Sequence, residues 1–334
     1  MHRRPDPSPR RAQWLRLESR LLALLGMGAL AMTALRFIIL TGPGPAIQSL
    51  YPLAGGLSVL LFIWRGWRRQ WRGLLLIAPA AACALVLSAQ SVRASTVPGG
   101  PNDIVVMAQN LYFGQADADA LVREVRDRHP DLLILPEATQ EAIGRLRRSG
   151  LDQLLPYQVG QLGSGANGTA IRSRYPLTWR EDDSLEAFGQ PTVTLRWGDR
   201  DITVRAVHTQ SPSPMHSGGW RTSLVRLRDW LQRQPADTPL LLAGDFNAST
   251  AHRAYREAVD GLVDAHAATG AGYVRTWPQE ASIPPFVQLD HVLVRGLGVV
   301  DAGLFSIPGT DHAGVWARVS LPAAGVASAA LSVP

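Results

Sequence analysis

The sequence contains very little cysteine and no lysine: among its 334 residues there is one cysteine, Cys83. A single cysteine excludes a disulfide within the chain and a metal site built from several thiolates. No motif with a cysteine or serine nucleophile is present, so we expect any hydrolysis to proceed by direct attack of water. Because lysine is absent, all 33 basic side chains are arginines.

The positive charge is concentrated at the start of the chain. Residues 1–95 carry twelve arginines against Asp6 and Glu18, a charge of +10, so the remainder contributes −4 to the total of +6. Proteins that bind nucleic acid through its phosphates usually carry a basic stripe on the binding domain. The mildly acidic remainder therefore argues against a nuclease, without excluding one.

Three long apolar runs lie in the same region, at residues 21–40, 47–64 and 73–89. A helix needs about 20 apolar residues to cross the hydrocarbon core of a bilayer, so these runs predict three transmembrane helices. A signal peptide is an alternative for the first run, but this run is longer than a usual signal core and two more follow it. Buried helices of a soluble domain are the other alternative.

The arginines orient these helices. Six precede the first run and four separate the second run from the third, whereas the loop at 41–46 is uncharged. Short arginine-rich segments stay in the cytoplasm, so we expect a cytoplasmic N-terminus and an extracytoplasmic position, in a bacterial cytoplasmic membrane, for everything after about residue 94. Arg36, near the outer end of the first run, is expected to anchor at the interface; holding a lipid phosphate is the alternative.

The chain is expected to divide into five parts: a cytoplasmic tail (1–20), a membrane anchor (21–92), a linker rich in proline and glycine (93–102), a catalytic domain (103–320) and a loose tail (321–334). Hydrophobic patterns in the fourth part predict strands at 104–108, 131–135, 167–171, 192–197, 202–208, 239–243, 290–294 and 314–319. They predict helices at 116–128, 139–149, 219–234 and 252–259. Strands alternating with helices indicate an α/β fold with two sheet layers flanked by helices.

Polar residues follow several of the predicted strands. Asn110 and Glu137 come after the first two, His208 ends another, and Gly244-Asp245-Phe246-Asn247 follows a fourth. Buried carboxylates need a partner, and oxygen ligands suit a hard divalent cation. Taken singly, each residue is explained as well by a turn or a solvated loop, and Asn110 can either ligate a metal or orient a carboxylate.

Two Asp-His pairs follow, Asp290-His291 and Asp311-His312. An aspartate bonded to a histidine fixes its tautomer and raises its basicity, so either histidine can serve as a general base. A loop with three prolines, at 278, 284 and 285, precedes the first of these pairs. We expect this loop to form a lip over the site.

The ordered set of motifs resembles the endonuclease/exonuclease/phosphatase superfamily over roughly residues 103–320. The residues that carry the resemblance are Asn110, Glu137, His208, Gly244–Asn247, Asp290, Thr310-Asp311-His312 and the segment Asn167–Pro176. The resemblance implies a four-layer α/β sandwich and dependence on Mg²⁺, with Mn²⁺ as the alternative ion. With three spans before the domain, the chain is similar to a membrane-anchored bacterial subgroup, the YafD-like and teicoplanin-resistance membrane phosphatase proteins. That likeness implies a lipid pyrophosphate such as undecaprenyl pyrophosphate as substrate.

The resemblance also implies roles for individual residues. The metal is expected to be bound by Asn110, Glu137 and Asp311. The catalytic set is expected to comprise His208, Asp245, Asn247, Asp290 and His312. Within it, Asp245 and Asn247 position the attacking water and the phosphate, and His208 donates to the phosphoryl oxygens. His312, oriented by Asp290, acts as base or as transition-state donor, and Asp245 is the alternative base.

Three functions are compatible with these features. We favour a membrane-anchored, divalent-metal-dependent hydrolase of phosphoester or phosphoanhydride bonds, with the bilayer and a phosphorylated, lipid-borne substrate as partners and no obligate protein partner. The alternative is an extracytoplasmic nuclease or other phosphodiesterase. A sensor or adaptor without activity is disfavoured by the complete set of acidic, amide and histidine motifs.

Overall fold

The structure is a computed structural model that describes residues 9–180, 188–213 and 217–321. Its centre consists of two six-stranded sheets. The first contains β1 (Ile104–Ala108), β2 (Leu132–Pro136), β3 (Tyr157–Gln161), β4 (Thr169–Ser173), β11 (Gly298–Phe305) and β12 (Gly314–Ser320), in the order β11-β12-β1-β2-β4-β3. The second contains β5 (Leu177–Trp179), β6 (Thr192–Trp197), β7 (Arg200–His208), β8 (Leu240–Asp245), β9 (Val263–Asp264) and β10 (Asp290–Arg295), in the order β5-β6-β7-β8-β10-β9.

The sheets pack face to face because their strands alternate apolar side chains between the two faces. Val106 of β1 and Leu241 of β8 are fully buried in one cluster between the sheets, whereas the neighbouring Met107 and Leu242 point to the outer faces. Each sheet has one parallel pair, β1 with β2 and β7 with β8, and its other pairs are antiparallel.

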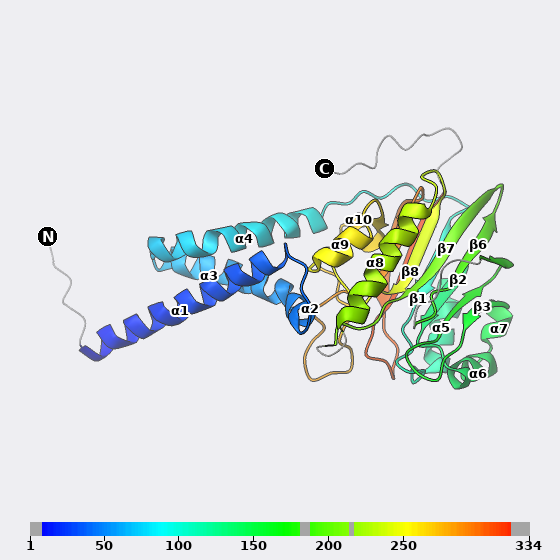
Figure 1. Ribbon diagram of the computed structural model, residues 1–334, viewed down its shortest axis with the longest axis horizontal. Coiled ribbons are helices and arrows are strands. Elements are labelled where there is room, and N and C mark those ends of the chain that lie inside the picture. Colours follow the sequence, from blue (N-terminus) through cyan, green and yellow to red (C-terminus); the bar gives the residue numbers. More distant parts are fainter. Residues whose placement is uncertain (1–8, 181–187, 214–216, 322–334) are drawn as a thin grey trace.

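Helices cover both outer faces (Figure 1). The first sheet is covered by α5 (Ala118–Arg128), α6 (Gln140–Arg148) and α7 (Leu151–Leu154), and the second by α8 (Ser217–Arg233) and α9 (Arg253–Ala258); α10 (Ala265–Ala268) packs on β10 and β11. The Asp117 carboxylate caps α5 by accepting the Ala120 N–H at 2.7 Å, and the Thr139 hydroxyl caps α6 at Ala142. The expected four-layer α/β sandwich is confirmed.

Four strands have no counterpart in the sequence prediction: β3, β5, β9 and β11. All four are the edge strands of their sheets. An edge strand need not be apolar on both faces, and the residues of β3 are all exposed or half-buried. In β11 a register shift between Val299 and Asp301 further disturbs the alternation on which the prediction depends.

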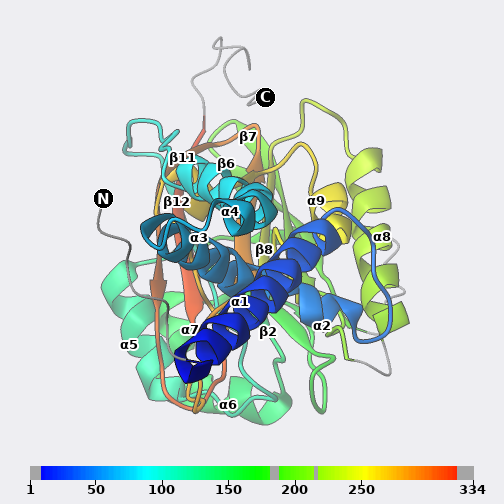
Figure 2. The same ribbon diagram turned by 90° about the vertical axis from the view of Figure 1, so that its left-hand side faces the viewer.

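The N-terminal helices project from one side of the sandwich (Figures 1 and 2). They are α1 (Pro9–Leu35), α3 (Tyr51–Trp67) and α4 (Trp71–Ser91), and the short α2 (Gly44–Gln48) lies where they meet the domain. Three stretches are long and apolar enough to span a membrane: Leu17–Leu35, Gly44–Trp67 and Gly73–Ser91. Large side chains such as Leu24, Leu60 and Leu75 are exposed on the bundle, as a lipid-facing surface requires.

The predicted linker is held against the domain. The Ser95 N–H donates to the Ala268 carbonyl at 2.7 Å and the Val97 N–H to the Val299 carbonyl at 2.8 Å. This segment is therefore docked along the domain and does not act as a free spacer. From residue 322 onward, the predicted C-terminal tail lies outside the described residues.

Candidate active site

The sheet topology brings most of the predicted site residues to one end of the sandwich. Because β1 and β2 run parallel, Asn110 and Glu137, which follow these strands, meet at the same edge. The parallel strands β7 and β8 end side by side, with His208 opposite Asp245. The site therefore draws on the carboxyl ends of both parallel pairs.

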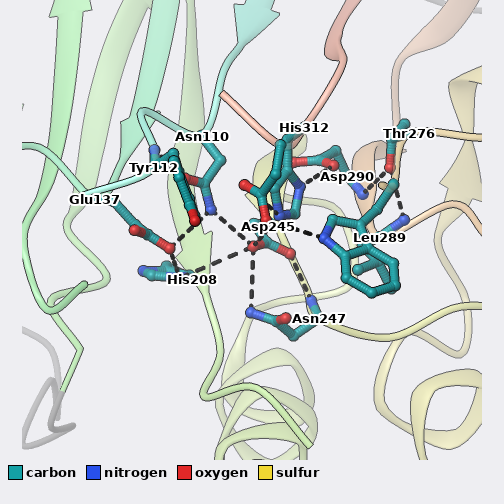
Figure 3. A network of polar contacts seen from close by, with 12 residues as sticks. Asn110, Tyr112, Glu137, His208, Asp245, Asn247, Thr276, Leu289, Asp290 and His312 are labelled. Carbon is teal, nitrogen blue, oxygen red and sulfur yellow. Dashed lines mark hydrogen bonds and ion pairs between the residues drawn. The ribbon is translucent and has the colours of Figure 1, made fainter. Parts of the chain in front are cut away.

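Antiparallel partners supply the remaining residues. Asp290 begins β10 directly opposite Asp245 in β8. His312 lies two residues before β12, which pairs with β1 so that Val315 faces Ala108. Residues from six segments at strand ends thus converge although they are up to 202 positions apart in the sequence. Figure 3 shows the resulting network.

Asn110 connects the two halves of the site. Its amide nitrogen donates to Glu137 Oε1 at 3.1 Å and to Asp245 Oδ2 at 3.0 Å, and its Oδ1 accepts the Tyr112 N–H at 2.8 Å (Figure 3). Of the two roles open to Asn110, this geometry matches the orientation of carboxylates. Glu137 Oε2 also accepts the Phe113 N–H at 2.6 Å. Burial raises the pKa of Glu137, although these N–H donors oppose the increase.

The Gly244–Asn247 turn fixes the Asp245 carboxylate. Its Oδ1 accepts the Asn247 N–H at 2.7 Å, and the Asn247 amide donates to Asp245 Oδ2 at 3.2 Å and to the Thr209 carbonyl at 3.0 Å. Gly244 has φ +135°, and a Cβ there would lie 2.1 Å from the Val207 carbonyl oxygen, so only glycine fits. Asn247 itself has a positive φ of 46°, a conformation concentrated at functional sites.

His312 is paired with Asp290, not with its sequence neighbour Asp311. Its Nδ1 lies 2.8 Å from Asp290 Oδ2, and its Nε2 points toward Asp245 Oδ2 at 3.8 Å. Burial alone would lower the pKa of His312, but the carboxylates of Asp290 and Asp245 outweigh it and raise the pKa to about 10. Burial raises the pKa of Asp245 to about 7. The positive charge of His312 opposes this increase, and the negative charge of Asp290 adds to it.

His208 faces the same space from β7. Its Nε2 lies 3.8 Å from Glu137 Oε1 and 3.9 Å from Asp245 Oδ2, and its ring packs edge-on against Phe188. Burial, followed by the positive charge of His312, lowers the pKa of His208 to about 3. His208 is therefore neutral at ordinary pH and can present an N–H to a substrate oxygen without adding charge.

His291 takes no part in this site. Its Nδ1 bonds Asp264 Oδ2 at 2.7 Å and the Tyr255 hydroxyl at 3.0 Å, and its Nε2 lies 3.0 Å from the Ala248 carbonyl. All of these partners lie in the interior of the domain. Of the two histidines in the Asp-His pairs, His312 is the one that reaches the cavity.

A cavity of about 540 Å³ opens over these residues. Its walls are largely aromatic and come from Tyr112, Phe113, Phe188, Trp277 and Phe286. Trp277 and Phe286 flank the proline-rich loop that was predicted to form a lip over the site. The Trp277 indole N–H donates to Asp311 Oδ2 at 3.1 Å. The sequence prediction missed Tyr112 and Phe113, although both directly follow the Gln109-Asn110-Leu111 motif.

Ala46 and Ser49 also line this cavity. Both lie at the start of the second candidate span, Gly44–Trp67, about 60 residues before the first predicted site residue. No sequence signal marks them, because neither is polar enough or patterned enough to stand out within an apolar stretch. The membrane anchor therefore contributes to the wall of the candidate site.

The donor set fits a divalent cation. One oxygen each of Asp245 and Asp290 and one nitrogen of His312 lie within 4.8 Å of one another, and all three residues are buried. Burial raises the pKa of Asp245, and a cation beside the carboxylate would favour its charged form. This group differs from the expected ligands Asn110, Glu137 and Asp311, of which Glu137 and Asp311 line the same cavity.

These pKa shifts predict a fall in the stability of the metal-free protein between about pH 7 and pH 10. His312 keeps its proton in the folded state until about pH 10, whereas an unfolded histidine loses it near 6.5. The folded state then binds more protons than the unfolded state. The stabilisation that protonated His312 contributes is therefore complete below about pH 6.5 and is lost as the pH rises toward 10. Thermal unfolding of the chelated protein across this range measures the effect.

The variant His312→Gln should show a flatter profile over the same range, because its side chain does not titrate. Mn²⁺ should raise the melting temperature of the wild-type protein most at the alkaline end, where the cation replaces the lost proton. A wild-type profile that stays level from pH 7 to 10 in chelator would contradict the assignment of a protonated His312.

With this geometry established, the comparisons with known proteins assign the family. Residues 107–312 match the Endonuclease/Exonuclease/phosphatase family. The chain belongs to this family. No curated protein matches the sequence significantly.

Several solved structures share the fold. A humanised D. rerio TDP2 has 15% identity and a TM-score of 0.54, covering 66% of this chain and 99% of its own. A truncated Caenorhabditis elegans TDP2 has 16% identity and a TM-score of 0.52, covering 65% and 98%. A family protein from Bacteroides thetaiotaomicron has 15% identity and a TM-score of 0.50, covering 67% and 100%. The family match begins at residue 107, after the N-terminal helices.

Proposed function

We propose that this protein is a membrane-anchored, divalent-metal-dependent hydrolase that cleaves a phosphoester or phosphoanhydride bond of a lipid-borne substrate at the extracytoplasmic face. Family membership supports the phosphoester chemistry. The observation that carries the choice of substrate is the position of the cavity, whose walls combine the acidic and histidine side chains with Ala46 and Ser49 of the anchor. A phosphate at the bilayer surface can enter such a cavity while its apolar tail stays in the membrane.

The proposed chemistry assigns each polar group a task. A bound cation neutralises phosphate charge and polarises the scissile group. Glu137 and Asp311 are proposed to hold it, and Asn110 keeps the Glu137 and Asp245 carboxylates in place. The buried group of Asp245, Asp290 and His312 is the second candidate position for a cation.

The remaining residues are proposed to act on the water and the phosphate. Asp245 and Asn247 orient the attacking water, and His208, neutral at ordinary pH, donates an N–H to the phosphoryl oxygens as charge develops. His312, held by Asp290 at 2.8 Å and with its pKa raised to about 10, acts as a donor in the transition state, and as a base only once it has lost its proton. Asp245 is the alternative base.

The charge balance supports a lipid substrate over nucleic acid. The membrane anchor and the likeness of its three spans to the YafD-like and teicoplanin-resistance membrane phosphatases favour a lipid pyrophosphate such as undecaprenyl pyrophosphate. The runner-up is a nuclease, since a D. rerio TDP2 structure contains a single-strand DNA product. Against it, residues 96–334 carry a net charge of −4, which does not favour a polyanion.

The test compares two substrates with the full-length protein in detergent. With Mg²⁺ or Mn²⁺, we expect phosphate release from undecaprenyl pyrophosphate in mixed micelles and no nicking of plasmid DNA. The variant Asp245→Asn, which keeps the size of the side chain and removes its charge, should release no phosphate and excludes a contaminating enzyme. Nicking of DNA that disappears in the same variant, without lipid hydrolysis, would instead establish the nuclease.

The location of the site is tested in intact spheroplasts with a soluble, membrane-impermeant phosphoester. Hydrolysis before lysis, lost in Asp245→Asn, is the expected result. Activity that appears only after lysis would place the domain in the cytoplasm and overturn the proposed orientation.

A further inference from the structure

The segment that leads into helix α3 lies against the catalytic loop. This segment, residues 41–50, contains α2, and its Ala46 and Ser49 line the same cavity as Asp245 and His312. Figure 1 shows α2 at the junction between the helical bundle and the sandwich. A tether would need no contact with the site, so the contact requires another explanation.

His252 lies at the centre of this junction. The side chain is fully buried, its Nδ1 accepts the Ser249 N–H at 2.9 Å, and its Nε2 lies 2.9 Å from the Pro45 carbonyl and 3.3 Å from Ser49 Oγ. Because Nδ1 is an acceptor, the proton of the neutral ring is on Nε2, which donates to Pro45. The proposed catalytic steps make no use of this histidine.

From His252 the contacts continue to the catalytic turn. Ser249 lies two residues beyond Asn247, and the Trp220 ring packs edge-on against His252 with the centroids 5.2 Å apart. The Trp220 indole N–H donates to the Asn247 carbonyl at 2.9 Å. His252 therefore supports the turn that carries Asp245 and Asn247 both directly through the backbone and through Trp220.

Arginines close the junction on a second side. The Arg256 guanidinium donates to the Arg36 carbonyl at 2.8 Å and to the Thr250 carbonyl at 2.7 Å, and Arg36 also donates to Thr250. Arg253 donates to the Phe37 carbonyl at 3.0 Å. Arg36 is buried and bonded to the domain, so its guanidinium holds the first span to the sandwich.

We propose that residues 41–50 form a wall of the active site and that His252 is the positioning residue that holds this wall against the loop of Asp245 and Asn247. The anchor then has two roles: it places the domain at the membrane, and it completes the site. Burial lowers the pKa of His252 to about 4, so the ring keeps the same hydrogen bonds throughout the neutral range. The inference rests on the proposed function only in the experiment that measures turnover.

The experiment uses the full-length protein in detergent with soluble bis(p-nitrophenyl) phosphate and Mn²⁺, so that access of a lipid does not limit the rate. His252→Phe keeps a ring of similar size beside Trp220 but removes both hydrogen bonds. Since a misplacement of about 1 Å can reduce a rate about 10²-fold, we expect kcat to fall about 10- to 100-fold with a smaller change in KM. His252→Gln, whose amide can still donate to Pro45, should recover part of kcat.

His266 provides the matched control. It is equally buried, its Nε2 lies 3.0 Å from the Gly303 carbonyl, and it does not line the cavity. His266→Phe should lower the melting temperature about as much as His252→Phe while kcat stays near the wild-type value. A wild-type kcat in His252→Phe, an equal loss in both phenylalanine variants, or no recovery in His252→Gln would overturn the positioning role.

Amide hydrogen exchange gives a readout that does not depend on activity. In His252→Phe, exchange should accelerate together in residues 44–50 and 247–252, whereas His266→Phe should leave both segments as in the wild type. Acceleration in only one of the two segments would overturn the proposal. If the wild-type protein hydrolyses neither a phosphoester nor the lipid pyrophosphate, the proposed function has failed, and hydrogen exchange alone still decides whether His252 couples the anchor to the catalytic loop.

Discussion

Replacement of His312 by alanine is expected to reduce turnover by about 10²- to 10⁴-fold, the range typical for loss of a positioned acid or base. The structure supports this expectation because His312 Nδ1 lies 2.8 Å from Asp290 Oδ2 while Nε2 points toward Asp245. The imidazole is thus held in one orientation, with its second nitrogen directed into the cavity. The measurement is kcat on the substrate identified by phosphate release, with saturating metal.

Asp290→Asn provides the companion variant. It keeps the size of the side chain but removes the charge that raises the pKa of His312. It should reduce turnover less than His312→Ala and should shift the alkaline limb of the pH–rate profile downward, since the imidazolium loses its main stabilising partner. An unchanged rate in His312→Ala would remove His312 from the catalytic set and leave Asp245 as the base.

Glu137→Ala is expected to lower metal affinity and turnover together. Glu137 is buried, accepts the Phe113 N–H at 2.6 Å and the Asn110 amide at 3.1 Å, and lines the cavity. If its carboxylate is the main cation ligand, its loss should reduce turnover on the order of 10²-fold or more at low Mg²⁺, and excess Mn²⁺ should restore part of the rate. Titration calorimetry with Mn²⁺ and steady-state kinetics over a metal series measure the two quantities on the same preparation.

Two variants control this experiment. Glu137→Gln retains the acceptor for Phe113 and separates loss of charge from loss of packing; it should resemble Glu137→Ala in metal affinity but unfold at a higher temperature. Glu124→Gln alters a half-buried glutamate of α5 that pairs with Arg128 away from the cavity, and it should leave both metal affinity and rate unchanged. A loss of rate in Glu137→Ala with wild-type Mn²⁺ affinity would assign the cation to the group of Asp245, Asp290 and His312.

The central strands could be predicted from the sequence and the edge strands could not. Residues 132–136 and 240–245 are buried on both faces and appear as continuous apolar runs bounded by polar residues. The edge strand β3 is exposed or half-buried along its length, so its residues carry no comparable pattern. Its pairing with β4 comes from main-chain hydrogen bonds, which the side-chain sequence does not encode.

The candidate site shows the same division. Asn110, Glu137, His208 and Asp245 could be selected because each follows or ends an apolar run. The residues themselves left two aspartates as partners for His312, its neighbour Asp311 and, through the family resemblance, Asp290. In the structure Asp290 takes this position, since β10 lies beside β8 and brings its first residue next to Asp245.

The sequence by itself determined the features that depend on local composition and periodicity: three apolar runs long enough to span a membrane, the arginine bias from which their orientation is predicted, the alternation of strands and helices, and the kinds of side chain available for phosphoester chemistry. Only the tertiary structure decided which of these groups meet. Ala46, Ser49 and His252 joined the site through contacts between segments about 200 residues apart. Such contacts follow from how the sheets, helices and anchor pack together, and they produce no periodic pattern in the sequence.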